Sequence, residues 1–119
     1  MTPSTQFWDE LAIESYKAIL KKRADHPLIH HNLGLAYIRV NKINKAIRSF
    51  QRAIKLDKEY ADAYYHLGNA YQTAGKALEA ARSFKKYLKF SKGAPKDPPV
   101  VENLLENLYA MNETENTDL

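Results

Sequence analysis

The sequence predicts an all-α fold built from antiparallel helix pairs. The first observation is a 34-residue period, and the second is that each period contains two apolar stripes at helical spacing, separated by a short turn. The third observation concerns the prolines, because a proline inside a helix would break it. All of them lie at expected helix starts or in linkers: Pro3, Pro27, Pro95, Pro98 and Pro99.

The first expected element is an amphipathic helix within residues 9–26. Four of its residues fall 34 positions before matching residues of the next unit: Ala12, Ser15, Tyr16 and Lys21. The segment therefore corresponds to the second half of a repeat. A second group of residues is expected to extend this helix toward the N-terminus and to shield its open side: Phe7, Trp8, Leu11 and Ile13.

Two full units follow, at residues 27–60 and 61–94. The stretch NLGLAY, which begins at Asn32, returns as HLGNAY at His66. Each unit reads as a helix, a tight turn and an antiparallel second helix. Asn41 and Gly75 occupy the equivalent turn position, and these are the residue types that best tolerate the positive φ that a helix C-terminal turn requires.

The repeated glycines lie inside the first helices, where glycine costs about 1 kcal/mol relative to alanine. We expect close approach of the second helix to offset this cost, with the small Ala46 and Ala80 opposite the glycines and aromatic rings beside them. Ten residues are assigned to this packing: Leu33, Gly34, Tyr37, Ala46, Phe50, Leu67, Gly68, Tyr71, Ala80 and Phe84.

Two-helix units of this length, with Leu-Gly-x-x-Tyr in the first helix and Ala-x-x-x-Phe in the second, resemble the tetratricopeptide repeat. The resemblance covers residues 27–94 fully and residues 9–26 as a lone second helix. It implies a short right-handed α-solenoid with two full repeats and an N-terminal half repeat. The sequence departs from the family pattern at four positions: His30 replaces a bulky packing residue, Lys58 and Lys92 replace a late proline, and Tyr87 replaces a small alanine.

The C-terminal part is expected to close the array. Residues 99–111 form an amphipathic segment, which in family terms is a capping helix over the last repeat. Its apolar face is expected to contain Val101, Leu104, Leu105 and Leu108. Residues 1–112 are thus expected to form one domain, and the acidic, polar residues 113–119 are expected to be disordered.

Composition narrows the function classes. The chain has no cysteine, which excludes disulfides and thiolate chemistry, and its net charge of +4 is modest. The basic residues recur along the second helices without interleaved aromatics, so we expect solvated outer faces and no nucleic-acid binding. No apolar run approaches the length of a membrane span, and no secretory signal is recognisable at the start. We therefore expect a cytoplasmic protein that does not insert into membranes.

The family resemblance implies that the first helices line a concave groove, where a peptide or helix of another protein binds. Asn32 and Asn69 can pair with a peptide backbone, Tyr65 offers apolar area, and Arg39 can pair with an acidic side chain. Each position is equally compatible with a solvated helix residue. The candidate partner-binding residues are His31, Asn32, Leu35, Arg39, Asp62, Tyr65, His66, Asn69, Gln72 and Thr73.

Three alternatives were weighed against this interpretation. A clamp for the C-terminal carboxylate of chaperones would need Lys and Arg where Asp62 and His66 stand, so we reject it. His31 and His66 on neighbouring first helices suggest metal or acid–base chemistry, but the full ligand set and the enclosed pocket are missing, so we expect no metal, no cofactor and no enzyme activity. Self-assembly through the open edge of the half repeat remains as the alternative function.

Overall fold

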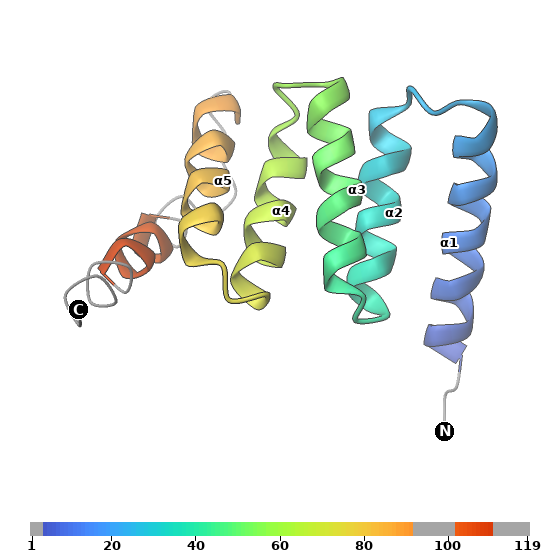
Figure 1. Cartoon of the computed structure of the whole chain (residues 1–119), viewed down its shortest axis with the longest axis horizontal. Helices are drawn as coiled ribbons and strands as arrows, with labels where there is room; N and C mark the ends of the chain where they lie inside the picture. Colours follow the sequence, from blue (N-terminus) through green and yellow to red (C-terminus); the bar gives the residue numbers. More distant parts are fainter. Residues whose placement is uncertain (1–3, 92–101, 111–119) are drawn as a thin grey trace. The chain divides into compact units, whose positions relative to one another are not determined.

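The computed structural model describes residues 4–91 and 102–110, and these residues contain helices and no strand (Figure 1). The predicted all-α class is thus confirmed. The chain divides into two compact units, Met1–Lys58 and Glu59–Leu119. The division falls two residues before the expected boundary between the repeats at 60 and 61, so each unit contains one full helix pair. The expected single domain over residues 1–112 stays a prediction.

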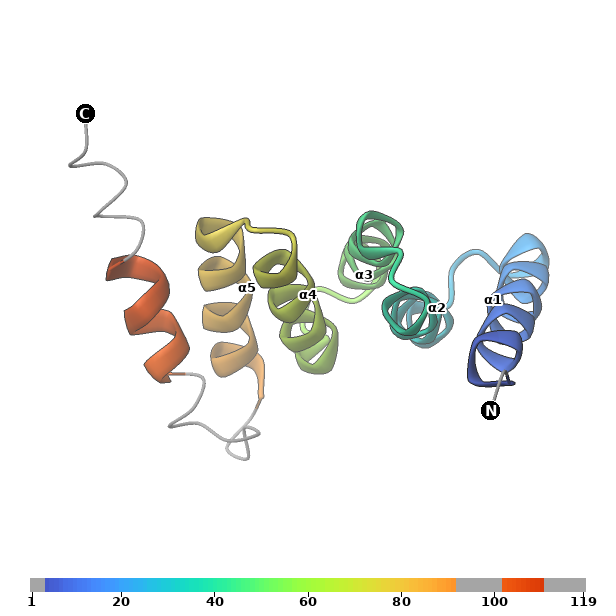
Figure 2. The same ribbon diagram turned by 90° about the horizontal axis from the view of Figure 1, so that it is seen from below.

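The first unit contains three helices: α1 (Ser4–Lys22), α2 (Pro27–Arg39) and α3 (Ile43–Leu56). Helix α2 contacts both α1 and α3, and it pairs with α3 as an antiparallel neighbour (Figures 1 and 2). Helix α1 starts at Ser4 and ends at Lys22. Both ends come earlier in the sequence than those of the expected segment, 9–26. The early end has a steric reason, because the residue before a proline disfavours the helical region and His26 is accordingly extended, with φ −108° and ψ 98°.

A left-handed residue closes the turn of each helix pair. Asn41 has φ 62°, and the next amide, that of Lys42, donates to the Tyr37 carbonyl at 2.9 Å. In the second unit Gly75 has φ 78°, and the Lys76 amide donates to the Tyr71 carbonyl at 2.8 Å. These bonds satisfy carbonyls that the helix end would otherwise leave open. The predicted positive φ at both turn positions is confirmed.

The packing inside the first unit centres on Gly34 and Phe50. A Cβ added at Gly34 would lie 2.5 Å from Cε1 of Phe50, so the aromatic ring itself occupies the space that the glycine leaves. This differs from the expectation that Ala46 lies opposite the glycine. Ala46 is fully buried in α3, and its small size lets α3 approach, but the ring of Phe50 makes the closest contact.

The second unit repeats this arrangement. It contains α4 (Ala61–Thr73), α5 (Ala77–Phe90) and a further helix at residues 102–110. A Cβ at Gly68 would lie 2.7 Å from Cε1 of Phe84. Tyr87, which stands where the family usually has alanine, is fully buried and contacts the ring of Tyr65, with centroids 5.1 Å apart. The extra volume of Tyr87 is therefore absorbed by an aromatic cluster within the unit.

The helix at residues 102–110 agrees with the amphipathic segment expected at 99–111. Leu108 is buried and Leu104 and Leu105 are half-buried, whereas Val101 lies outside the described residues. The role of this helix as a cap stays a prediction, and the expected tail at 113–119 also lies outside the described residues. None of the helices that the structure describes combines the length and apolar composition of a membrane span.

Candidate functional site

The exposed side of α2 carries the first group of candidate residues. Leu28, Asn32, Leu35 and Arg39 follow one another at intervals of three and four residues, so they share one face of the helix. We call these four residues the α2 stripe. Leu28 and Arg39 are exposed, and Asn32 and Leu35 are half-buried. The stripe thus combines aliphatic area with an amide and a guanidinium group.

His31 and Arg39 are more engaged within the first unit than the sequence suggested. The ring of His31 is only 6% exposed and packs against Phe50, with centroids 5.7 Å apart, so little of it can reach a partner. Arg39 Nε donates to Asp9 Oδ1 of α1 at 2.7 Å. Half of the Arg39 side chain remains exposed, at 51%, and a guanidinium has further donors. Arg39 can therefore contact a partner only while it also holds α1.

The corresponding face of α4 is more polar. Asp62, His66, Asn69 and Thr73 occupy the same relative positions as the α2 stripe, and we call them the α4 stripe. Asp62 and Thr73 are exposed, whereas His66 and Asn69 are half-buried. The Thr73 hydroxyl donates to the Asn69 carbonyl at 3.0 Å. Gln72, also among the candidates, lies beside this stripe and is exposed.

Tyr65 lies at the edge of the α4 stripe and belongs to an aromatic cluster. Its ring centroid is 5.1 Å from that of Tyr87, 5.3 Å from that of His66 and 6.1 Å from that of Phe84. The side chain is half-buried, so one side of the ring is fixed by packing. A tyrosine held in this way offers contact area to a ligand with little further loss of conformational entropy.

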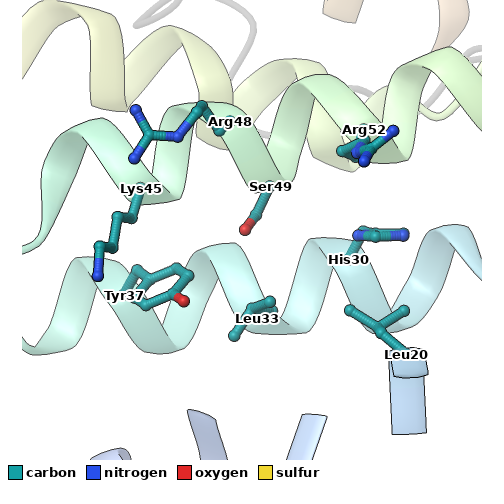
Figure 3. Close-up of a pocket in the computed structure, with 8 residues that line it drawn as sticks. All are labelled: Leu20, His30, Leu33, Tyr37, Lys45, Arg48, Ser49 and Arg52. Atoms are coloured by element: carbon teal, nitrogen blue, oxygen red, sulfur yellow. The ribbon is translucent and has the colours of Figure 1, made fainter. Parts of the chain in front are cut away.

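The structure also contains a hollow that sequence reasoning did not identify. It has a volume of about 370 Å³ and lies in the first unit between α2, α3 and the end of α1 (Figure 3). Lys45, Arg48 and Arg52 come from α3, and Figure 3 shows the Ser49 hydroxyl directed toward α2. The remaining lining residues are Leu20, His30, Leu33 and Tyr37.

This hollow has the chemistry of an anion-attracting surface. Three cations line its α3 side. Lys45 Nζ also lies 5.9 Å from the centroid of the Tyr37 ring, and His30 Nε2 donates to the Ala24 carbonyl at 2.8 Å. The sequence places these cations on an outer helix face, and that remains true of the three α3 residues. The sequence could not predict the hollow, because the hollow depends on the position of Leu20, near the end of α1, relative to α3.

The side chains around the two candidate histidines, His31 and His66, do not support a metal site. Among the described residues no three His, Asp or Glu side chains come together as a set of metal ligands. His30 is buried in the packing position that the bulky family residue occupies, as its place in the repeat predicted, and His26 precedes the first turn of α2. The stripes therefore offer hydrogen-bonding and apolar groups for recognition.

Family models match the chain over much of the two helix pairs. A TPR repeat model matches residues 36–75, and a tetratricopeptide repeat model matches residues 61–93. The matched segments contain both turns, at Asn41 and Gly75, and the second glycine, Gly68, whereas Gly34 precedes the first match. A comparison with curated proteins by sequence gives no match.

Several solved structures have folds similar to that of this chain. One is a crystal structure of MamA, which is 28% identical with a TM-score of 0.75; the match covers 85% of this chain and 57% of the MamA chain. This chain therefore spans little more than half the length of that relative. The second TPR of Spaghetti (RPAP3), bound to the HSP90 peptide SRMEEVD, is 30% identical with a TM-score of 0.67, and the match covers 69% of this chain and 76% of the other.

A third structure is the second TPR domain of human RPAP3 in complex with the HSP70 peptide SGPTIEEVD, determined by NMR. It is 27% identical with a TM-score of 0.73, and the match covers 85% of this chain and 81% of the other. These neighbours share the helix pairs described above, and two of them were solved with a peptide of a partner protein.

Proposed function

The chain belongs to the tetratricopeptide repeat family, and from this premise we propose that it is a non-enzymatic interaction module that binds a peptide or helix of a partner protein. The α2 and α4 stripes are the proposed contact surfaces, as first helices of the family line the concave groove. One observation carries the proposal: each first helix presents a half-buried amide, Asn32 or Asn69, next to aliphatic or aromatic area that is itself held by packing.

The residue types on these stripes fit recognition of a main chain. An amide side chain can donate to a backbone carbonyl and accept from a backbone N–H at the same time. Leu35 beside Asn32, and Tyr65 beside Asn69, supply area that excludes water around such bonds. The RPAP3 domains were solved with a bound peptide, which supports peptide binding by this chain through analogy of fold.

The charge of the α4 stripe limits the kind of partner. Asp62 is exposed, and a carboxylate there repels an acidic ligand. The peptides in the two RPAP3 structures end in Glu-Glu-Val-Asp. We therefore propose that this chain prefers a neutral or basic segment over an acidic C-terminal tail.

The proposal can be tested with peptides selected from a random display library on the wild-type protein. Fluorescence polarisation then measures the affinity of each peptide for wild type, Asn32→Ala and Asn69→Ala. Loss of an amide that pairs with a peptide backbone should weaken binding by roughly tenfold, since a lost hydrogen bond costs about 1–2 kcal/mol. The peptide SRMEEVD should bind more weakly than the selected peptides, and Asp62→Asn should raise its affinity.

Arg48→Ala is the matched control, because Arg48 lies on α3 at the hollow of Figure 3 and not on a stripe. Tyr65→Phe is preferred to Tyr65→Ala, because truncation would remove a ring from the aromatic cluster. Selected peptides that bind both amide variants as wild type does, yet lose affinity for Arg48→Ala, would move the site from the stripes to the hollow.

A second function is favoured by a separate observation. The outer side of α1 carries large exposed apolar side chains, among them Phe7 and Trp8. Large apolar side chains that gather on one exposed side of a helix mark a surface that packs against a partner. We therefore propose, as the alternative function, self-assembly of the protein through the open edge of the half repeat.

A further inference from the structure

Helix α1 has two faces of opposite character. Ile13 is buried, and Asp9, Tyr16 and Leu20 are half-buried; together they mark the face toward α2, which is the only one of the five labelled helices that α1 contacts. The opposite face, which we call the outer face of α1, is exposed. It consists of Phe7, Trp8, Leu11, Ser15, Ala18 and Ile19.

The exposure of the outer face is unusual for its residue types. Phe7 is 58% exposed, Trp8 61%, Leu11 48% and Ile19 42%. The rings of Phe7 and Trp8 contact each other edge to face, with centroids 5.2 Å apart, so they form one apolar surface. Contiguous apolar surface of this kind marks an interaction site, whereas scattered single residues do not. Phe7, Trp8 and Leu11 were expected to shield the open side of the half repeat. They instead form an exposed surface that itself needs a partner.

Residue size changes along the outer face. The large side chains of Phe7, Trp8 and Leu11 lie in the first half of the helix, and the small Ser15 and Ala18 lie in the second half. Small residues allow a facing helix to approach. With a two-fold axis near Ser15, an antiparallel helix of the same sequence would bring the small Ser15 of both copies together at the crossing and set Leu11 of each copy against Ile19 of the other.

The charge of the side chains also changes along α1. Acidic residues occupy the first half and basic residues the second half: Asp9, Glu10 and Glu14, followed by Lys17, Lys21 and Lys22. Except for the Lys17–Glu14 contact of 3.8 Å within one helix turn, no close ion pair is formed inside α1, and both of those side chains are largely exposed. Glu10, Glu14, Lys17 and Lys21 lie along one edge of the outer face at helical spacing.

We propose that α1 pairs with α1 of a second copy in an antiparallel arrangement, through the outer face and with the two-fold axis near Ser15. Antiparallel pairing sets Glu10 and Glu14 of each copy against Lys21 and Lys17 of the other. Parallel pairing would place like charges opposite one another. The inference rests on the self-assembly proposed above and specifies its geometry.

The area of the outer face determines the expected affinity of the dimer. The apolar side chains of two outer faces supply less buried area than the roughly 1,200 Å² of a stable complex, because only one helix of each copy takes part. The dimer should therefore dissociate in the micromolar range and form progressively as the protein is concentrated.

The first experiment uses the full chain and its single tryptophan, Trp8, which lies on the outer face. Sedimentation equilibrium should detect a monomer–dimer equilibrium, and Trp8 emission should shift to shorter wavelength over the same concentration range as the indole leaves water. A protein that stays monomeric, with emission independent of concentration, would overturn both self-assembly and the antiparallel arrangement.

Charge-reversed variants test the pairing itself. Glu10→Lys/Glu14→Lys and Lys17→Glu/Lys21→Glu should each dimerise at least tenfold more weakly than wild type, since each creates repulsion at both ends of the interface. An equimolar mixture should recover the affinity as a heterodimer. Arg82→Glu/Lys85→Glu on α5 is the matched control and should dimerise as wild type does. Circular dichroism checks that each variant folds, as exposed positions should allow.

Cysteine cross-linking tests the direction, and the absence of native cysteine makes each introduced thiol unique. Ser15→Cys should cross-link between copies with a short bifunctional thiol reagent. Lys22→Cys should not, because antiparallel pairing about Ser15 separates the two residues by about 20 Å along the axis. Dimers in which Lys22→Cys cross-links and Ser15→Cys does not, or in which charge reversal has no effect, would overturn the antiparallel arrangement and leave self-assembly standing.

Discussion

At the scale of single residues, the two interior glycines are explained by the rings that cover them. Gly34 and Gly68 each lie under a phenylalanine of the paired helix, at distances that leave no room for a methyl group. The cost of glycine in a helix, about 1 kcal/mol, is offset by the burial of Phe50 and Phe84, each of which is worth about 2–3 kcal/mol. The glycine and the phenylalanine therefore form one packing unit that occurs twice.

This explanation predicts that Gly34→Ala destabilises the protein although alanine favours helix. Overpacking costs about 1–3 kcal/mol, which equals or exceeds the gain in helix propensity of about 1 kcal/mol, so the free energy of unfolding should fall by up to about 2 kcal/mol in a urea titration. Phe50→Leu combined with Gly34→Ala should cost less than the sum of the two single changes, because leucine leaves space for the added methyl.

Gly75→Ala is the control for this experiment. No atom lies within 4 Å of a Cβ added there, so its cost should come from the positive φ alone, about 1–2 kcal/mol, and should add to that of Phe50→Leu without coupling. Strict additivity of Gly34→Ala and Phe50→Leu would contradict the packing explanation.

Sequence reasoning at this scale identified which residues pack but not every contact that they make. The period singled out the glycines and the phenylalanines, and the turn residues were correctly given positive φ. The ring over the glycine was missed because side-chain direction depends on how each helix is rotated about its axis. For the same reason the burial of His31 and the bond from Arg39 to Asp9, thirty residues apart, could not be predicted.

At the scale of elements, α1 is held in the first unit by its contact with α2. It contacts α2 only, through Ile13 and its half-buried neighbours and through the ion pair between Asp9 and Arg39. Asp9 is 17% exposed and Arg39 51%, so solvent screens part of the attraction. The ion pair therefore selects the register of α1 on α2 more than it stabilises the fold.

The expected effect of Asp9→Asn is correspondingly small in global stability but visible in α1. The free energy of unfolding should fall by about 0.5 kcal/mol, while hydrogen exchange of the α1 amides should accelerate several-fold more than that of the α3 amides. High salt should reduce the difference between wild type and variant. Equal acceleration in α1 and α3 would show that the ion pair acts on the whole unit instead.

The limits of the elements were predictable where a backbone rule applies. Pro27 sets the start of α2, and the turns at Asn41 and Gly75 separate the paired helices. The end of α1 at Lys22 was not identified, because Arg23 and Ala24, which follow, are compatible with a longer helix, and the rule for the residue before a proline restricts only His26. The candidate stripes follow from helical periodicity, whereas the hollow of Figure 3 depends on three helices at once.

At the scale of the whole molecule, stability is divided between two units that each have a core of their own. Phe50 is fully buried in the first and Phe84 in the second, among small and aromatic side chains of the same unit. In repeat proteins, stability is a sum of the contributions of the repeats and of the interfaces between neighbours. The two units should therefore respond separately to local damage.

We expect Gly34→Ala to accelerate hydrogen exchange in α2 and α3 more than in α4 and α5, and Gly68→Ala to do the reverse. Mass spectrometry of peptic fragments under native conditions measures both units in one experiment. Equal acceleration across all the helices in either variant would mean that the chain opens only as a single cooperative unit.

The turn at Gly75 is a suitable site for inserting extra residues. The residue is exposed, lies at the tip of a helix pair and has no neighbour within 4 Å of its missing side chain. Extra residues inserted at such a tip should leave the packing of α4 and α5 intact, because a longer loop costs little entropy. An affinity tag or a fluorescent reporter could be introduced there to follow binding and assembly, since Gly75 belongs neither to a stripe nor to α1.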